Sequence, residues 1–217
     1  MTTPHLINVL IHVLGGAAAI VLGFVILAAA KGTAWHRRRG RQFVALALVV
    51  CMSAALGSAL FRFVPVFAML TVLVLYQLLS GWHAVFTRVA GPNALDALMA
   101  LGAAVGAVLL VPVVLAELAR LGQSPAVVYA TLGALASLLA YDAARFLFPR
   151  AWHALTWKYE HIYKMVATLF GLLSAASGNL LAFAQPWSQI LPSVLGLMTI
   201  LALWWRQHAA AGRLTSP

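Results

Sequence analysis

The side chains of this chain that could do chemistry are few, and most are histidines or carboxylates in or beside apolar segments. The 217 residues include seven histidines and only four acidic residues. Imidazole and carboxylate ligands suit zinc, iron or copper, and a pair of histidines can hold a haem iron. Ionisable side chains inside a membrane are costly, so each one within an apolar segment is a candidate functional residue. The candidate ligands are His36, His83, Asp142, His153, Glu160 and His161.

His83 and His161 are the principal candidates for binding a cofactor. Tyr76, Ser80 and His83 follow an i, i+4, i+7 pattern, which places a polar stripe on one helix face. His161 directly follows Glu160 at an expected helix start. We therefore predict haem b or a transition metal near the inner membrane face. The predicted metal ligands are His83, Asp142, Glu160 and His161, and the weaker cofactor candidates are His36 and His153.

Each candidate also has an ordinary structural interpretation. Asp142 and Arg145 lie one turn apart and would form an interfacial ion pair. Glu160 and Lys164 have the i, i+4 spacing of a helix-stabilising pair. A structural hydrogen bond would account for His83. The two weaker histidines would be solvated loop residues.

A second polar group is expected on the opposite side of the membrane. His12 lies six residues into the first apolar segment, about 9 Å deep at 1.5 Å per residue, on one face with Asn8. Asn179, in the sixth apolar segment, is a candidate partner. Because a bilayer core is roughly 30 Å thick, His12 and His83 are too far apart to ligate one cofactor.

The composition predicts a membrane protein. The chain is 64% hydrophobic and 8% charged, with a mean hydropathy of +0.97, whereas soluble domains carry about 25% charged residues. The single cysteine, Cys51, excludes an intramolecular disulfide. We expect one all-α domain over residues 1–217, a polytopic transmembrane helical bundle of about seven spans. The expected spans are 6–30, 42–63, 66–87, 95–118, 126–148, 161–184 and 188–205.

The distribution of cations predicts the orientation. With the N-terminus outside and the C-terminus cytoplasmic, twelve of the fourteen lysines and arginines fall on the cytoplasmic side, including Arg145 and Lys164. An excess of Lys and Arg in short loops marks that side. The segment KGTAWHRRRGR, residues 31–41, is expected to anchor the chain to anionic lipid of the cytoplasmic leaflet, and the confinement of the cations argues against nucleic acid. Its cations are Lys31, Arg37, Arg38, Arg39 and Arg41.

Three stretches resemble a known family. They are HVLGGAAAIVLGFVILAAAKGTAWHRRRGRQFV at 12–44, LYQLLSGWHAV at 75–85 and KYEHIYKM at 158–165. Together they are similar to a bacterial membrane family catalogued as domain of unknown function 2306. The resemblance implies a multi-spanning protein of the bacterial inner membrane. It implies no established activity and brings no catalytic residues.

Three classes of function fit these observations, and the sequence does not decide whether the protein is an enzyme. The first is a redox protein that binds haem or a metal at the inner histidines. The second is a transporter of small solutes or ions that uses the buried polar groups. The third is an accessory or assembly protein without catalysis, acting in a homo-oligomer or with a membrane partner. Intramembrane hydrolysis is a minor alternative, because SGWH at 80–83 lacks a later paired-histidine motif.

Overall fold

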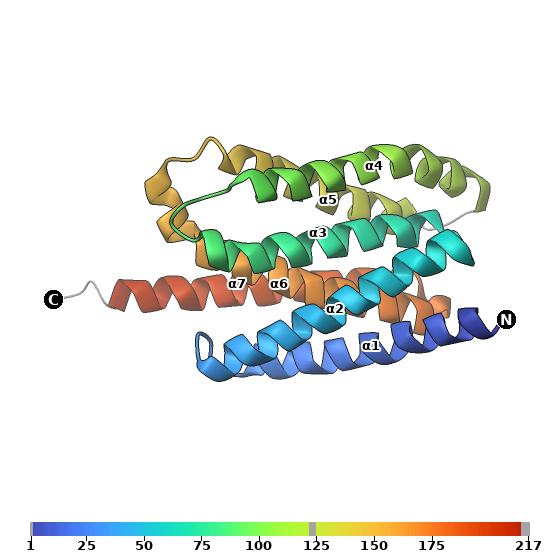
Figure 1. Cartoon of the computed structure of the whole chain (residues 1–217), viewed down its shortest axis with the longest axis horizontal. Helices are drawn as coiled ribbons and strands as arrows, with labels where there is room; N and C mark the ends of the chain where they lie inside the picture. Colours follow the sequence, from blue (N-terminus) through green and yellow to red (C-terminus); the bar gives the residue numbers. More distant parts are fainter. Residues whose placement is uncertain (1, 122–124, 214–217) are drawn as a thin grey trace.

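Long helices account for nearly all of the structure, a computed structural model that describes residues 2–121 and 125–213. Seven α-helices run alternately in opposite directions along the bundle (Figure 1). No strand is present within the described residues. This confirms the predicted all-helical bundle. The helices are α1 (Thr3–Ala28), α2 (Ala34–Leu60), α3 (Pro65–Thr87), α4 (Ala94–Leu121), α5 (Pro125–Arg145), α6 (Arg150–Leu180) and α7 (Trp187–Arg213), with a short 3-10 helix, η1 (Ala182–Ala184), before α7.

Six of these helices are long and apolar enough to cross a membrane. Their outward faces carry large apolar side chains, such as Leu14, Val108 and Leu109, which are 66–72% exposed. Such faces suit lipid, which supplies the apolar surroundings that water cannot. The remaining helix, α6, is 31 residues long. It carries buried charged residues, which lower its hydropathy. The chain is therefore a polytopic membrane protein.

Helices α3 and α6 form the centre of the bundle (Figure 1). Helix α6 contacts α1, α3 and α7, and α3 also contacts α2, α4 and α5. One apolar core joins α1, α2, α3, α6 and α7 around Phe43, Leu169 and Phe170. A second core joins α3, α4 and α5 around Met69 and Leu138. Helix α3 belongs to both cores, and Tyr163 of α6 packs against both.

Glycines permit the closest approaches to α6. A Cβ atom at Gly81 of α3 would lie 2.6 Å from the Cβ of Lys164. A Cβ atom at Gly23 of α1 would lie 2.4 Å from a terminal carbon of Leu169. Small residues at helix crossings let backbones approach closely in membranes. The crossing of α3 over α6 therefore depends on Gly81.

Two helices begin earlier than the hydropathy pattern predicts. Helix α2 begins at Ala34 rather than at residue 42, because Thr33 caps it by accepting a hydrogen bond from the His36 amide at 3.0 Å. Helix α6 begins at Arg150, directly after Pro149, rather than at residue 161. In both cases the polar first turns extend the helix beyond the apolar segment. Hydropathy locates the span, whereas capping locates the end of the helix.

Most exposed cations gather at one end of the bundle, here called the cationic end, where α1, α3, α5 and α7 finish, whereas Arg62 is exposed at the opposite end. Partial burial and the charge of Arg206 lower the pKa of Lys31, whose ammonium donates to three carbonyl oxygens near the end of α1. Arg145 and Lys164, expected among the interfacial cations, are instead buried. The exposed cations of this end are Lys31, Arg37, Arg38, Arg39, Arg41, Arg88, Arg150, Lys158 and Arg206.

Candidate functional site

Asp142 of α5 is the centre of a buried group of charges. Its Oδ1 accepts a hydrogen bond from Lys164 Nζ at 2.6 Å and lies 3.2 Å from Arg145 Nη1. Its Oδ2 accepts a hydrogen bond from the Tyr76 hydroxyl at 2.6 Å. The side chains of Asp142, Arg145 and Lys164 are 5%, 3% and 0% exposed. One carboxylate thus binds donors from α3, α5 and α6.

Arg145 extends this group to a second carboxylate. Its Nη2 lies 2.8 Å from Glu160 Oε2 on α6, and both side chains are 3% exposed. The Tyr141 hydroxyl donates to Glu160 Oε1 at 2.9 Å. Two cations and two carboxylates therefore balance one another inside the bundle. We call these residues the buried charge network: Tyr76, Tyr141, Asp142, Arg145, Glu160 and Lys164.

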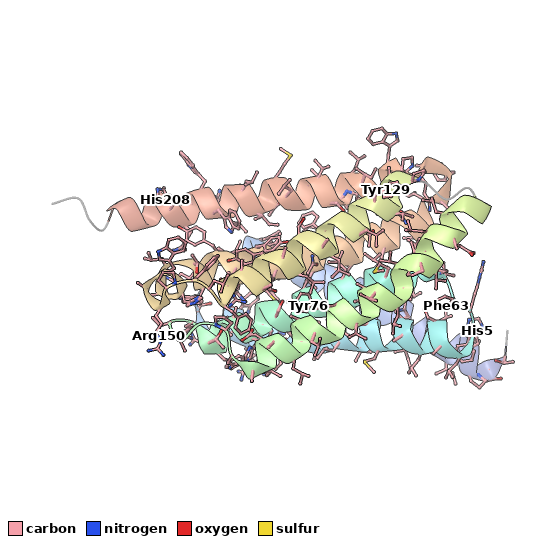
Figure 2. All side chains as sticks on the ribbon, turned by 90° about the horizontal axis from the view of Figure 1, so that it is seen from above. His5, Phe63, Tyr76, Tyr129, Arg150 and His208 are labelled. Carbon is pink, nitrogen blue, oxygen red and sulfur yellow. The ribbon has the colours of Figure 1, made fainter. Side chains whose placement is uncertain are left out.

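The network reaches from the cationic end to the middle of the bundle. Tyr76 is the central residue of α3, whereas Arg145 is the last residue of α5. Figure 2 shows Tyr76 between Arg150 at one end and Phe63 at the other. An ion moved from water into an apolar interior loses several kcal/mol of solvation, which an oppositely charged partner must offset. The pairing within the network supplies that compensation.

The pairing differs in part from the sequence-based expectation. The ion pair between Asp142 and Arg145 is confirmed. Lys164, however, pairs with Asp142 rather than with Glu160, and Glu160 pairs with Arg145. The reason is that the side chains of α6 meet α5 at this level, so charges pair across helices instead of along one helix.

His83 contacts an acid that the sequence analysis did not single out. Its Nδ1 lies 3.1 Å from Asp96 Oδ1 near the start of α4. The other oxygen of Asp96 accepts a hydrogen bond from the Asn93 amide at 2.9 Å, and Asn93 Oδ1 accepts one from the Leu95 amide. An Asn followed three residues later by an acid resembles a capping box. The spacing of Asn93 and Asp96 was the sequence signal that could have identified Asp96 as a residue of this helix start.

The remaining inner histidines have separate surroundings. His161 Nδ1 contacts the Gly81 carbonyl oxygen at 2.9 Å. His153 was expected to be a loop residue, but it lies on α6, is 5% exposed and packs against Gly91, whose φ of +79° suits glycine. His36, also expected in a loop, lies in the first turn of α2, and its Nδ1 is buried without a hydrogen-bond partner.

The structure does not assemble the predicted metal ligands into one group. Within residues 2–121 and 125–213, no three His, Cys, Asp or Glu side chains are arranged to hold a metal ion. His83 faces Asp96, and His161 faces a backbone carbonyl. The two predicted carboxylate ligands, Asp142 and Glu160, both form ion pairs with Arg145. Asp142 also forms one with Lys164. The residues present therefore do not fit the predicted four-ligand site.

The polar residues of the opposite end connect α1 to α2. Asn8 Nδ2 donates to the Ser53 carbonyl oxygen at 3.1 Å, and His12 Nδ1 lies 3.0 Å from Ser53 Oγ. Asn179, the expected partner, is exposed and donates to the Ala175 carbonyl oxygen of its own helix at 2.9 Å. Asn8 and His12 therefore act as hydrogen-bonding contacts between two helices.

Comparison with known proteins adds no relative. No family model, no curated protein and no solved structure matches the chain. The fold defines the class, a polytopic helical membrane protein. The candidate site within that class is the buried charge network, assigned from its own geometry.

Replacing Lys164 with methionine should destabilise the protein by about 3–5 kcal/mol, because Asp142 would lose a buried partner. The double variant Asp142→Asn, Lys164→Met should be less destabilised than the sum of the single variants, since it removes both charges together. Denaturant unfolding of the purified protein in detergent measures each free energy. Lys158→Met, an exposed change on the same helix, is the control, and equal effects of Lys158→Met and Lys164→Met would contradict the assignment.

Proposed function

We propose that this chain is a proton-translocating protein of the bacterial inner membrane, and that the buried charge network carries the proton. The observation that supports this most is the contact between Lys164 Nζ and Asp142 Oδ1, 2.6 Å long and enclosed by the bundle. Ionisable groups inside a membrane are rare and typically belong to ion pathways or proton relays. A carboxylate and an ammonium group joined by a hydrogen bond can exchange a proton. Transfer of the proton from Lys164 to Asp142 would leave both groups neutral.

Stability alone is a weak reason for such a network. Replacing buried ion pairs with well-packed apolar residues is often neutral or stabilising, because desolvation offsets the attraction between the charges. The chain nevertheless places two carboxylates and two cations in its interior. A role in moving charge accounts for this arrangement better than a role in holding helices together.

Buried polar groups continue along α6 beyond the network. Glu160, Lys164 and Thr168 recur every fourth residue on one face, and all three are buried. Further along the helix, Ser174 Oγ donates to the Gln189 carbonyl oxygen of α7 at 2.7 Å. These groups support a route along α6 from the cationic end towards the opposite end, with Glu160 as the entry.

The other functional classes are less well supported. A metal at the inner histidines is less well supported because the described residues bring no three ligand side chains together, although the Nδ1 contacts of His83 and His161 do not involve their Nε2 atoms. An accessory protein without activity would be compatible with the same bundle, but it would conduct no protons. A transporter of a small solute would share the network as its proton-coupling site. Proton movement therefore separates the proposed function, and a proton-coupled transporter, from an accessory protein.

We further propose that the N-terminus is outside, the C-terminus is cytoplasmic and the chain belongs to the family that it resembles, domain of unknown function 2306. The orientation is supported by the exposed cations and by Trp35, Trp82, Trp152, Trp157, Trp204 and Trp205, which belong to the helix ends at the cationic end. Cytoplasmic loops carry an excess of Lys and Arg, and tryptophans favour the membrane interface.

Fusion of a reporter that is active only in the periplasm tests this orientation. A reporter joined after Gln185 should be active, because the loop before α7 would face the periplasm. Reporters joined after Pro92 or Pro149 should be inactive, because those loops lie at the cationic end. An active reporter after Pro92 together with an inactive one after Gln185 would reverse the proposed orientation.

The proton hypothesis is tested with purified protein in liposomes that contain a pH-sensitive dye. A potassium diffusion potential should drive proton entry through the wild-type protein. Asp142→Asn keeps the size of the side chain but removes its ionisation, so it should reduce the rate to that of empty liposomes.

Glu117→Gln is the matched control, because Glu117 is the one acid of the chain with no place in the network or in a contact with His83. This variant should conduct protons like the wild type. A wild-type rate equal to that of empty liposomes, or full activity in Asp142→Asn, would contradict proton translocation through the network.

A further inference from the structure

A groove between α1 and α2 opens on the lipid-facing surface near the cationic end. Its volume is about 410 Å³. One face of α2 provides most of the groove lining, since the α2 residues of the lining recur at helical spacing. Along the helix these residues change from polar to apolar. The lining residues are Leu22, Arg39, Gln42, Ala45, Leu46 and Val49.

The polar mouth of this groove is held in place by its own contacts. Arg39 Nη1 donates to Gln42 Oε1 at 3.0 Å, and the guanidinium carbon lies 5.8 Å from the centre of the Trp35 ring. A guanidinium has five N–H donors, so most remain for a ligand. Trp35 is 42% exposed. Tryptophan side chains favour the depth at which lipid headgroups meet the hydrocarbon.

Among the described residues, no exposed carboxylate side chain lies at this end. Asp96, Asp142 and Glu160 are buried and contact His83 or the network cations. Glu117, the fourth acid, is near the opposite end of α4. Lys31 and Arg37 donate to backbone carbonyls. No described side chain therefore supplies a counter-charge for Arg39.

We propose that this groove binds one anionic phospholipid in a defined position. Its phosphate contacts the free donors of Arg39, since arginine binds phosphate through two parallel hydrogen bonds. One acyl chain lies along Leu46 and Val49 and against Leu22. Neither a soluble phosphate nor general attraction to the membrane surface would use the apolar half of the groove.

A second groove of about 410 Å³ provides an internal comparison. It lies between the same two helices at the opposite end and is lined by apolar residues with Asn8 and Thr3 but no cation. The two grooves have the same volume and differ in charge. Selective binding of an anionic lipid should therefore occur only at the groove that contains Arg39.

Native mass spectrometry of the detergent-purified protein measures the binding. The probes are phosphatidylglycerol, phosphatidylcholine with the same acyl chains, and inorganic phosphate. Wild type should retain one phosphatidylglycerol in preference to the other two. Arg39→Gln should weaken that binding by about tenfold, because it removes the charged donor. Ala45→Trp should weaken it similarly by filling the groove without changing the charge.

Two controls match these variants. Arg150→Gln removes an exposed cation of the same end outside the groove, and Ile7→Trp fills the uncharged groove. Both should bind phosphatidylglycerol like the wild type. Equal weakening by Arg39→Gln and Arg150→Gln with no effect of Ala45→Trp would show general charge attraction and overturn the proposal. Equal retention of phosphatidylcholine, or tighter binding of inorganic phosphate, would also overturn it.

Discussion

The requirement that buried charges be paired constrains the centre of this bundle. Asp142 can lie in the interior only because donors from α3, α5 and α6 meet its two oxygens. Glu160 depends in the same way on Arg145 and Tyr141. A shift of any one helix along its axis would leave a charge without a partner, at a cost of several kcal/mol. The network therefore fixes the relative positions of three helices.

The packing of α3 against α6 follows from this constraint. Gly81 lies against the stem of Lys164, and the Gly81 carbonyl oxygen contacts His161 one turn earlier on α6. A side chain at Gly81 would push α6 away and lengthen the contact between Lys164 and Asp142. One glycine thus connects the apolar packing of the bundle to its charge pairing. The same crossing accounts for the position of His161, which the sequence suggested as a cofactor ligand.

The sequence predicted the elements of the fold better than the partners within it. Continuous apolar segments identified all seven helices. Bilayer thickness sets the length of a membrane span, so each span is recognisable as an apolar segment of that length. Helix spacing also predicted the pair of Asp142 and Arg145. The partners of Lys164 and His83 could not be predicted, since they lie on other helices, and one sequence does not state which helices are neighbours. The starts of α2 and α6 were misplaced because helices continue beyond the membrane core.

The central claim is that Asp142 is an ionised carboxylate held by cations inside the membrane. The chain has only two aspartates, Asp96 and Asp142, so labelling aspartate with ¹³C isolates two carboxyl groups in an infrared spectrum. Comparison of the wild type with Asp142→Asn then assigns the signal of Asp142. At neutral pH we expect Asp142→Asn to remove an ionised carboxylate band. Loss of a protonated carboxyl band instead would contradict the account.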